Sequence, residues 1–115
     1  EKDKYRPAAE KNRDYADHVA EAIEDGGVLL CKISDFTDNA LSLHHTEKGM
    51  TSASLYKKAT KYLLVVDVFE ARLKRAYRDG DVPVPKSTIE TLIRQMQTGK
   101  QKLLDIQARH APASV

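Results

Sequence analysis

One stretch of about 25 residues limits the fold more than any other part of the chain. Between Thr51 and Gly80, apolar residues recur at intervals of three and four, with charged residues between them. This spacing is typical of an α-helix that buries one face, and a helix of that length extends roughly 38 Å. The apolar positions are Leu55, Ala59, Tyr62, Leu63, Val66, Phe69, Leu73, Ala76 and Tyr77. The same spacing elsewhere in the 115 residues predicts an all-α fold with one modest core.

Three other segments are expected to be helical. The first begins after Pro7, and the glycine pair Gly26–Gly27 is expected to end it. The second runs from about residue 28 to 45. The last begins at Ser87, which with Glu90 matches a capping box. Before it, two prolines in the segment 82–85 predict an extended connector.

The short connections between these segments predict an antiparallel three- to four-helix bundle with a long C-terminal helical hairpin. We divide the chain into an N-terminal accessory helix (1–27), a helical bundle (28–110) and a frayed tail (111–115). The longest apolar runs are far shorter than the roughly 20 residues of a membrane span.

The sequence offers little material for catalysis. Phosphate-binding glycine patterns are missing, so no nucleotide cofactor is expected. His44 and His45 are adjacent and would point about 100° apart on a helix, which disfavours a metal site. Cys31 lies in an apolar run and is interpreted as a buried structural thiol, and a single cysteine favours a reducing, cytoplasmic location. We therefore expect no enzymatic activity, metal or small-molecule substrate.

Charge divides the chain into two halves. Residues 1–50 contain seven Lys or Arg and eleven Asp or Glu, whereas residues 51–115 contain twelve and six. The acidic half could neutralise the basic hairpin within one bundle, or the hairpin could bind an acidic partner. Nucleic acid is the weaker alternative, because the aromatic residues lie near the apolar stripe rather than among the lysines.

Short motifs in the last two helices point to a known family. The segment 53–59, ASLYKKA, followed by Tyr62 and Leu63, resembles the second helix of microtubule-interacting and trafficking (MIT) domains. The segments LYKKA at 55–59, PKSTI at 85–89 and LIR at 92–94, with Arg78 and Gly80, are most similar to the C-terminal MIT-type region of Unc-51-like autophagy-initiating kinases. The resemblance implies a targeting region that contacts a regulatory subunit of such a kinase.

The resemblance also implies that the domain docks a partner in a groove between two helices. We predict the groove between the third and fourth helices, with an acidic amphipathic helix or peptide as the partner. The predicted floor is apolar and consists of Val65, Phe69, Leu73, Ile93, Met96 and Leu104. The predicted rim consists of the cations Arg72, Arg94 and Lys100. Each apolar residue could instead belong to the core, and the domain could instead be a homo-oligomerisation bundle.

Overall fold

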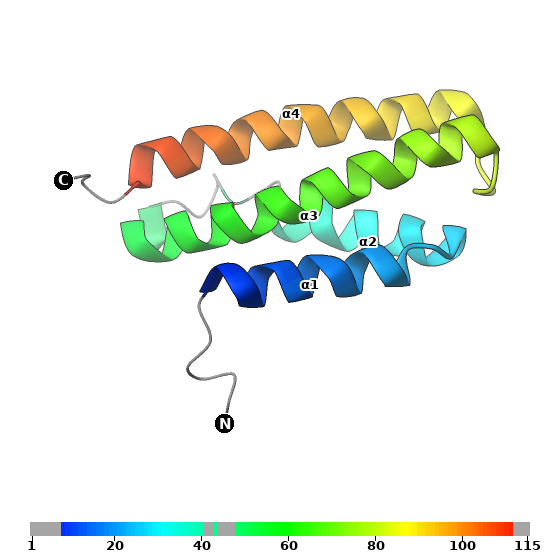
Figure 1. The fold of residues 1–115 in the computed structure, drawn as a ribbon. Coiled ribbons are helices and arrows are strands. Elements are labelled where there is room, and N and C mark those ends of the chain that lie inside the picture. Colours follow the sequence, from blue (N-terminus) through cyan, green and yellow to red (C-terminus); the bar gives the residue numbers. More distant parts are fainter. Residues whose placement is uncertain (1–7, 41–42, 44–47, 112–115) are drawn as a thin grey trace.

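A computed structural model describes residues 8–40, 43 and 48–111. Its helices are α1 (Ala8–Ala22), α2 (Gly26–Asn39), α3 (Ser52–Asp79) and α4 (Lys86–His110). Successive helices alternate in direction, so that α1 and α3 run the same way and α2 and α4 run the opposite way (Figure 1). The predicted all-α fold and the long α3–α4 hairpin are confirmed.

The turn between α1 and α2 differs from the prediction. Gly26 and Gly27 do not end α1; they form the first turn of α2, because the Asp25 side chain caps that helix. Asp25 Oδ1 accepts hydrogen bonds from the amides of Gly27 at 2.8 Å and Val28 at 3.1 Å. A side chain at position 26 would lie 3.0 Å from the carbonyl oxygen of Asp81, so this close approach to the α3–α4 connector favours glycine.

The other helix ends agree with the sequence in part. Helix α2 ends at Asn39, earlier than predicted, and His44 and His45 lie outside the described residues. Helix α3 begins as predicted, with Thr51 Oγ1 accepting the Ser54 amide at 3.1 Å. It ends as predicted at Gly80, whose φ of 68° is left-handed.

The predicted capping box at the start of α4 is wrong. Helix α4 begins at Lys86, so Ser87 already lies within its first turn, and no side chain caps this end. Pro85 takes the cap position through its backbone: its carbonyl oxygen accepts the amides of Thr88 at 3.0 Å and Ile89 at 3.2 Å. The extended backbone that the two prolines impose therefore decides where α4 begins.

Helix α3 lies at the centre of one core to which all four helices contribute. Its Phe69 ring lies 5.1 Å from the ring of Phe36 on α2, measured between centroids. Val19 and Ile23 of α1 belong to the same buried cluster as Met96 of α4. The described part of the 1–27 segment therefore packs as part of the bundle. None of the described helices combines the length and the apolar character that crossing a membrane would require.

Candidate functional site

Most of the predicted groove floor lies in the core. Val65, Phe69, Leu73 and Met96 are all at most 2% exposed. A partner could reach them only by separating the helices. The remaining floor residues differ, because Ile93 is half-buried and Leu104 is 39% exposed.

The predicted rim residues are also separated. Arg72 is buried, Arg94 is exposed and Lys100 is half-buried. Arg94 Nη2 donates to Thr91 Oγ1 of its own helix at 3.4 Å. Lys100 faces α3, where its Nζ lies 2.8 Å from Asp67 Oδ1, and this hydrogen bond raises the pKa of the Lys100 ammonium. The three cations therefore do not line one groove.

Polar side chains bridge the outer side of the α3–α4 hairpin. Besides the Lys100–Asp67 pair, Gln97 Nε2 donates to Glu70 Oε2 at 3.1 Å and Gln107 Nε2 donates to Thr60 Oγ1 at 2.9 Å. We call these three cross-helix pairs the α3–α4 seam. The seam joins the two helices along much of the predicted groove, and a hollow of about 370 Å³ remains beyond it, lined by Lys74, Tyr77, Glu90 and Ile93.

Glu70 gives the seam a pH dependence. The hydrogen bond from Gln97, helped by the neighbouring Lys74, lowers the pKa of the Glu70 carboxyl from its ordinary 4.5. A carboxyl whose pKa is lower in the folded state stabilises the fold above its unfolded pKa, and this stabilisation is lost as the pH falls through the folded pKa. We expect Glu70→Gln to lower the unfolding free energy at pH 7 by up to about 1 kcal/mol, and the difference to shrink below pH 4.5. Urea unfolding of both proteins across pH 3 to 7 measures this, and a difference that is constant with pH would contradict it.

An open groove lies instead between α1 and α3, near the ends of both helices. It is a hollow of about 570 Å³, and we call it the α1–α3 groove. Its apolar lining consists of Ala20 and Ile23 from α1, and Val68 and Ala71 from α3. Its charged lining consists of Glu24, Arg72, Lys74, Arg75 and Arg78. Four of these five side chains are cations, so the lining itself is rich in positive charge, and each cation pairs with a carboxylate: Arg72 with Asp81, Lys74 with Glu70, Arg75 with Glu24 and Arg78 with Asp79.

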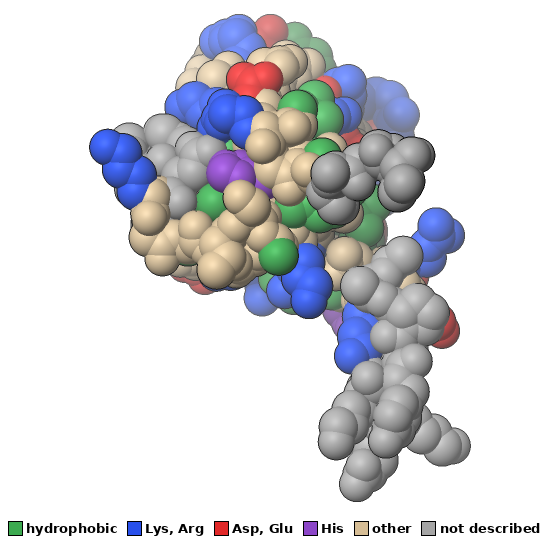
Figure 2. All heavy atoms as spheres, turned by 90° about the vertical axis from the view of Figure 1, so that its left-hand side faces the viewer, with side chains coloured by type: hydrophobic (Ala, Val, Ile, Leu, Met, Phe, Trp, Pro, Cys, Tyr) green, Lys and Arg blue, Asp and Glu red, His purple; other side chains and the backbone are tan. Residues whose placement is uncertain are grey.

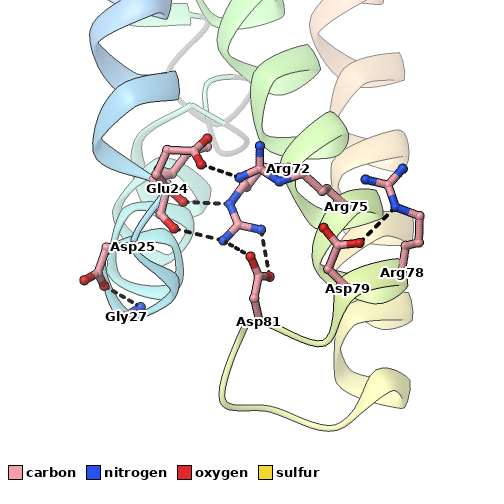
Figure 3. A network of polar contacts seen from close by, with 9 residues as sticks. Glu24, Asp25, Gly27, Arg72, Arg75, Arg78, Asp79 and Asp81 are labelled. Carbon is pink, nitrogen blue, oxygen red and sulfur yellow. Dashed lines mark hydrogen bonds and ion pairs between the residues drawn. The ribbon is translucent and has the colours of Figure 1, made fainter.

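Buried Arg72 lines this groove and is the centre of a network of polar contacts (Figure 3). Its Nε donates to the carbonyl oxygen of Ile23 at 2.9 Å, and its Nη2 donates to that of Glu24 at 3.0 Å. These carbonyls follow the last turn of α1, where a helix leaves acceptors without partners. Its Nη1 and Nη2 also bind the two carboxylate oxygens of Asp81, each at 3.1 Å. Arg72 thus joins the end of α1 to the α3–α4 connector.

Sequence reasoning placed Arg72 on a groove rim and missed this role. A signal was present, because Arg72 lies three residues after Phe69 and next to Leu73, on the apolar face of the helix. A cation at a core-facing position needs buried acceptors. The sequence does not show that the acceptors are two carbonyls from α1.

Of the other cations of the groove, Lys74 and Arg78 are exposed and Arg75 is half-buried, and all three form ion pairs near the surface. Arg75 Nη2 lies 2.6 Å from Glu24 Oε1, and this hydrogen bond raises the pKa of the Arg75 guanidinium. Arg78 Nε lies 3.0 Å from Asp79 Oδ1, which lowers the pKa of Asp79. Exposed ion pairs contribute roughly 0 to 1 kcal/mol each, so a partner carboxylate can replace the present ones.

Ion pairs among the described residues lie both between and within the two halves of the charge division. Arg75–Glu24 joins the basic hairpin to α1, whereas the Arg72–Asp81 and Lys100–Asp67 ion pairs lie within the hairpin. At the end of the bundle where α1 and α3 begin, Lys and Arg side chains lie around the edge, and hydrophobic ones form small separate areas (Figure 2). Among the described residues, apolar side chains on this face are scattered rather than gathered in one area (Figure 2).

Another hollow, the cysteine and the metal-binding residue types give weaker candidate sites than the α1–α3 groove. A hollow of about 340 Å³ between α1, α2 and α3 is lined in part by Lys32, Asp35 and Tyr62, and burial raises the pKa of the Tyr62 hydroxyl.

Cys31 is exposed, so its interpretation as a buried thiol is wrong: it points outward from α2, on the opposite side from Leu29 and Ile33. Within the part of the chain that the structure describes, no three His, Cys, Asp or Glu side chains are grouped to hold a metal ion.

Comparison with known proteins leaves the family open. No family model matches the sequence, and neither the curated proteins nor the solved structures contain a match. The findings therefore describe a small four-helix domain without a family assignment.

Proposed function

We propose that this domain is a non-catalytic protein-interaction module that docks an acidic amphipathic helix, and that the helix binds in the α1–α3 groove. The observation that carries the proposal is the combination of an apolar floor with a basic rim in one open hollow. The partner chemistry is the one expected from the sequence, but the groove is different from the predicted one. The buried α3–α4 floor leaves the α1–α3 groove as the better surface.

Each part of the groove has a role in this docking. Val68 and Ala71 offer apolar surface that is not fully buried, and burying it under apolar partner residues supplies affinity. Lys74, Arg75 and Arg78 surround that surface and would attract carboxylates, which sets the register of the partner and speeds association. Because their present ion pairs are exposed, exchanging them for partner carboxylates costs little.

The MIT resemblance supports the same class of function. MIT-type domains capture helices or peptides in grooves between helices, and the motif at 53–59 lies on α3, which forms one wall of the groove. On this proposal the domain is cytoplasmic and belongs to the targeting region of an autophagy-related kinase, where it contacts a regulatory subunit. The catalytic domain would then lie elsewhere in that protein.

Two designed peptides test the docking. Each has 18 residues, with leucines along one helical face and four glutamates in two turns at one end. The N-acid peptide has the glutamates at its N-terminus, and the C-acid peptide is the same sequence reversed. We expect at least one of them, labelled with fluorescein, to bind in an anisotropy titration. Ala71→Glu and Arg78→Glu should each weaken this binding about 10-fold or more, since they place a carboxylate in the groove.

Arg94→Glu is the matched control, because it reverses an exposed cation on α4 outside the groove. It should change the affinity by less than about 2-fold. Failure of both peptides to bind, or equal weakening by all three variants, would overturn the proposal. So would a concentration-dependent dimer that Ala71→Glu dissociates, since the groove would then serve self-association. Duplex DNA binding that Arg78→Glu abolishes and that falls steeply with salt would replace the proposal with nucleic-acid binding.

A further inference from the structure

The α3 side of the groove changes from apolar to basic along its length. Leu64, Val68, Ala71, Arg75 and Arg78 follow one another at intervals of three or four residues, which places them along one line of the helix surface. The line extends roughly 21 Å, or about four turns. Leu64 at its start lies outside the hollow, one turn before Val68, and is 39% exposed, so it extends the apolar surface beyond the groove. Apolar surface thus occupies the first half of the line and positive charge the second half.

The α1 wall changes from apolar to acidic in the same direction. It is apolar at Ala20 and Ile23 and ends at the carboxylate of Glu24, which pairs with Arg75. Helices α1 and α3 run in the same direction, and the end of α1 lies beside the last turns of α3, where Glu24 pairs with Arg75 (Figure 1). Figure 3 shows this end, where Arg72, Arg75 and Arg78 project from successive turns of α3. The groove therefore has a defined polarity.

A helical partner must match this polarity with its own. Its apolar residues have to meet Leu64, Val68 and Ala71, so its carboxylates have to lie at one end, beside Arg75 and Arg78. A helix accommodates carboxylates best in its first turns, where they interact favourably with the positive end of its dipole. At the C-terminal end of the partner, the same carboxylates would destabilise the helix that must form.

From these two requirements, and resting on the proposed function, we infer the direction of the bound helix. Its N-terminal turns carry the acidic residues and lie beside Arg75 and Arg78, and it runs antiparallel to α1 and α3. The same antiparallel relation joins α3 to α4 within the hairpin. The partners that fit are therefore helices that begin with an acidic segment and continue with an apolar face of about two turns.

The two reversed peptides separate this inference from the proposed function. We expect the N-acid peptide to bind about 5-fold more tightly than the C-acid peptide, because only its charges favour both the groove and the helix. The direction of the bound peptide is measured by NMR with a nitroxide label on the peptide. Cys31 is first replaced by Ser, because it is exposed and would react with the label. A nitroxide at the N-terminus of the N-acid peptide should broaden the amide signals of residues 75–80. A nitroxide at its C-terminus should broaden those of residues 61–65.

The outcomes are distinguishable. The reverse broadening pattern, or tighter binding of the C-acid peptide, overturns the direction while docking in the groove stands. If neither peptide binds, the proposed function fails, and the direction fails with it. Arg78→Gln should weaken the N-acid peptide several-fold, and Arg94→Gln should not; equal effects would show that the acidic turns do not lie at Arg78.

Discussion

Phe69→Asp is expected to unfold the domain. The Phe69 side chain is 2% exposed and packs against Phe36 in the centre of the core. Truncation of a buried phenylalanine to alanine costs about 3 to 5 kcal/mol. A carboxylate at the same position adds the cost of burying a polar or charged group. Since domains of this size are stable by about 5 to 15 kcal/mol, the variant should retain little cooperative structure.

Circular dichroism and urea unfolding measure this result. Leu104→Asp is the control, because Leu104 is an exposed apolar residue on the same hairpin. It should change the unfolding free energy by about 0.5 kcal/mol or less. A Phe69→Asp protein that unfolds cooperatively with near-native stability would show that Phe69 is accessible, as the predicted α3–α4 groove requires.

The contrast between these two residues shows what helical periodicity can predict. It identified α3 as a long helix, because the apolar spacing and the Gly80 stop are local features of the sequence. It did not identify which side of α3 is open. Helix α3 is enclosed by α1, α2 and α4, so residues on several of its sides are buried, and an apolar residue there is core more often than surface.

The helix ends that were predicted wrongly each had a competing determinant. Gly26 and Gly27 open α2 because the Asp25 side chain caps that helix, and position 26 also lies close to the carbonyl oxygen of Asp81, more than 50 residues away in the chain. The start of α4 is set by the backbone of Pro85, which took precedence over the capping box at Ser87. A sequence pattern describes the local preference for a cap, but it does not describe a competing contact or backbone constraint.

The α3–α4 seam shows that the sequence alone also could not predict which charged residues pair with each other. Lys100 was expected to meet an acidic partner, and in the structure it pairs with Asp67. The two residues are 33 positions apart, and they meet because the connector between α3 and α4 fixes the register of the hairpin. The sequence predicts the hairpin but not its register, so it could not show which cations were already paired.

Arg72→Met is the second change with a large expected effect. Methionine retains much of the side-chain length but none of the four hydrogen bonds that Arg72 makes. The carbonyl oxygens of Ile23 and Glu24 then lose their donor, and Asp81 loses its partner. Breaking a buried charge network typically costs about 3 to 5 kcal/mol. Because Asp81 is partly exposed and can be hydrated again, we expect about 3 kcal/mol in urea unfolding.

The loss of stability in Arg72→Met should differ from one helix to another. Arg72 holds the end of α1 on α3, so amides near the end of α1, at residues 19–23, should exchange with solvent much faster in Arg72→Met. Amides of α3 and α4 that face each other should be affected less. Arg72→Lys keeps the charge but not the planar fork, so it should restore only part of the stability. Arg78→Met removes an exposed arginine of the same groove and should change neither exchange nor stability by much.

These variants also connect the fold to the proposed function. Arg72 is 4% exposed and offers little surface to a partner, so it can influence docking chiefly by holding α1 in place as the second wall of the groove. In Arg72→Met, peptide affinity should therefore fall together with the protection of the α1 amides from exchange with solvent. In Arg78→Met, affinity should fall while protection stays. Unchanged peptide affinity in an Arg72→Met protein whose α1 has lost protection would mean that α1 is not a wall of the binding site.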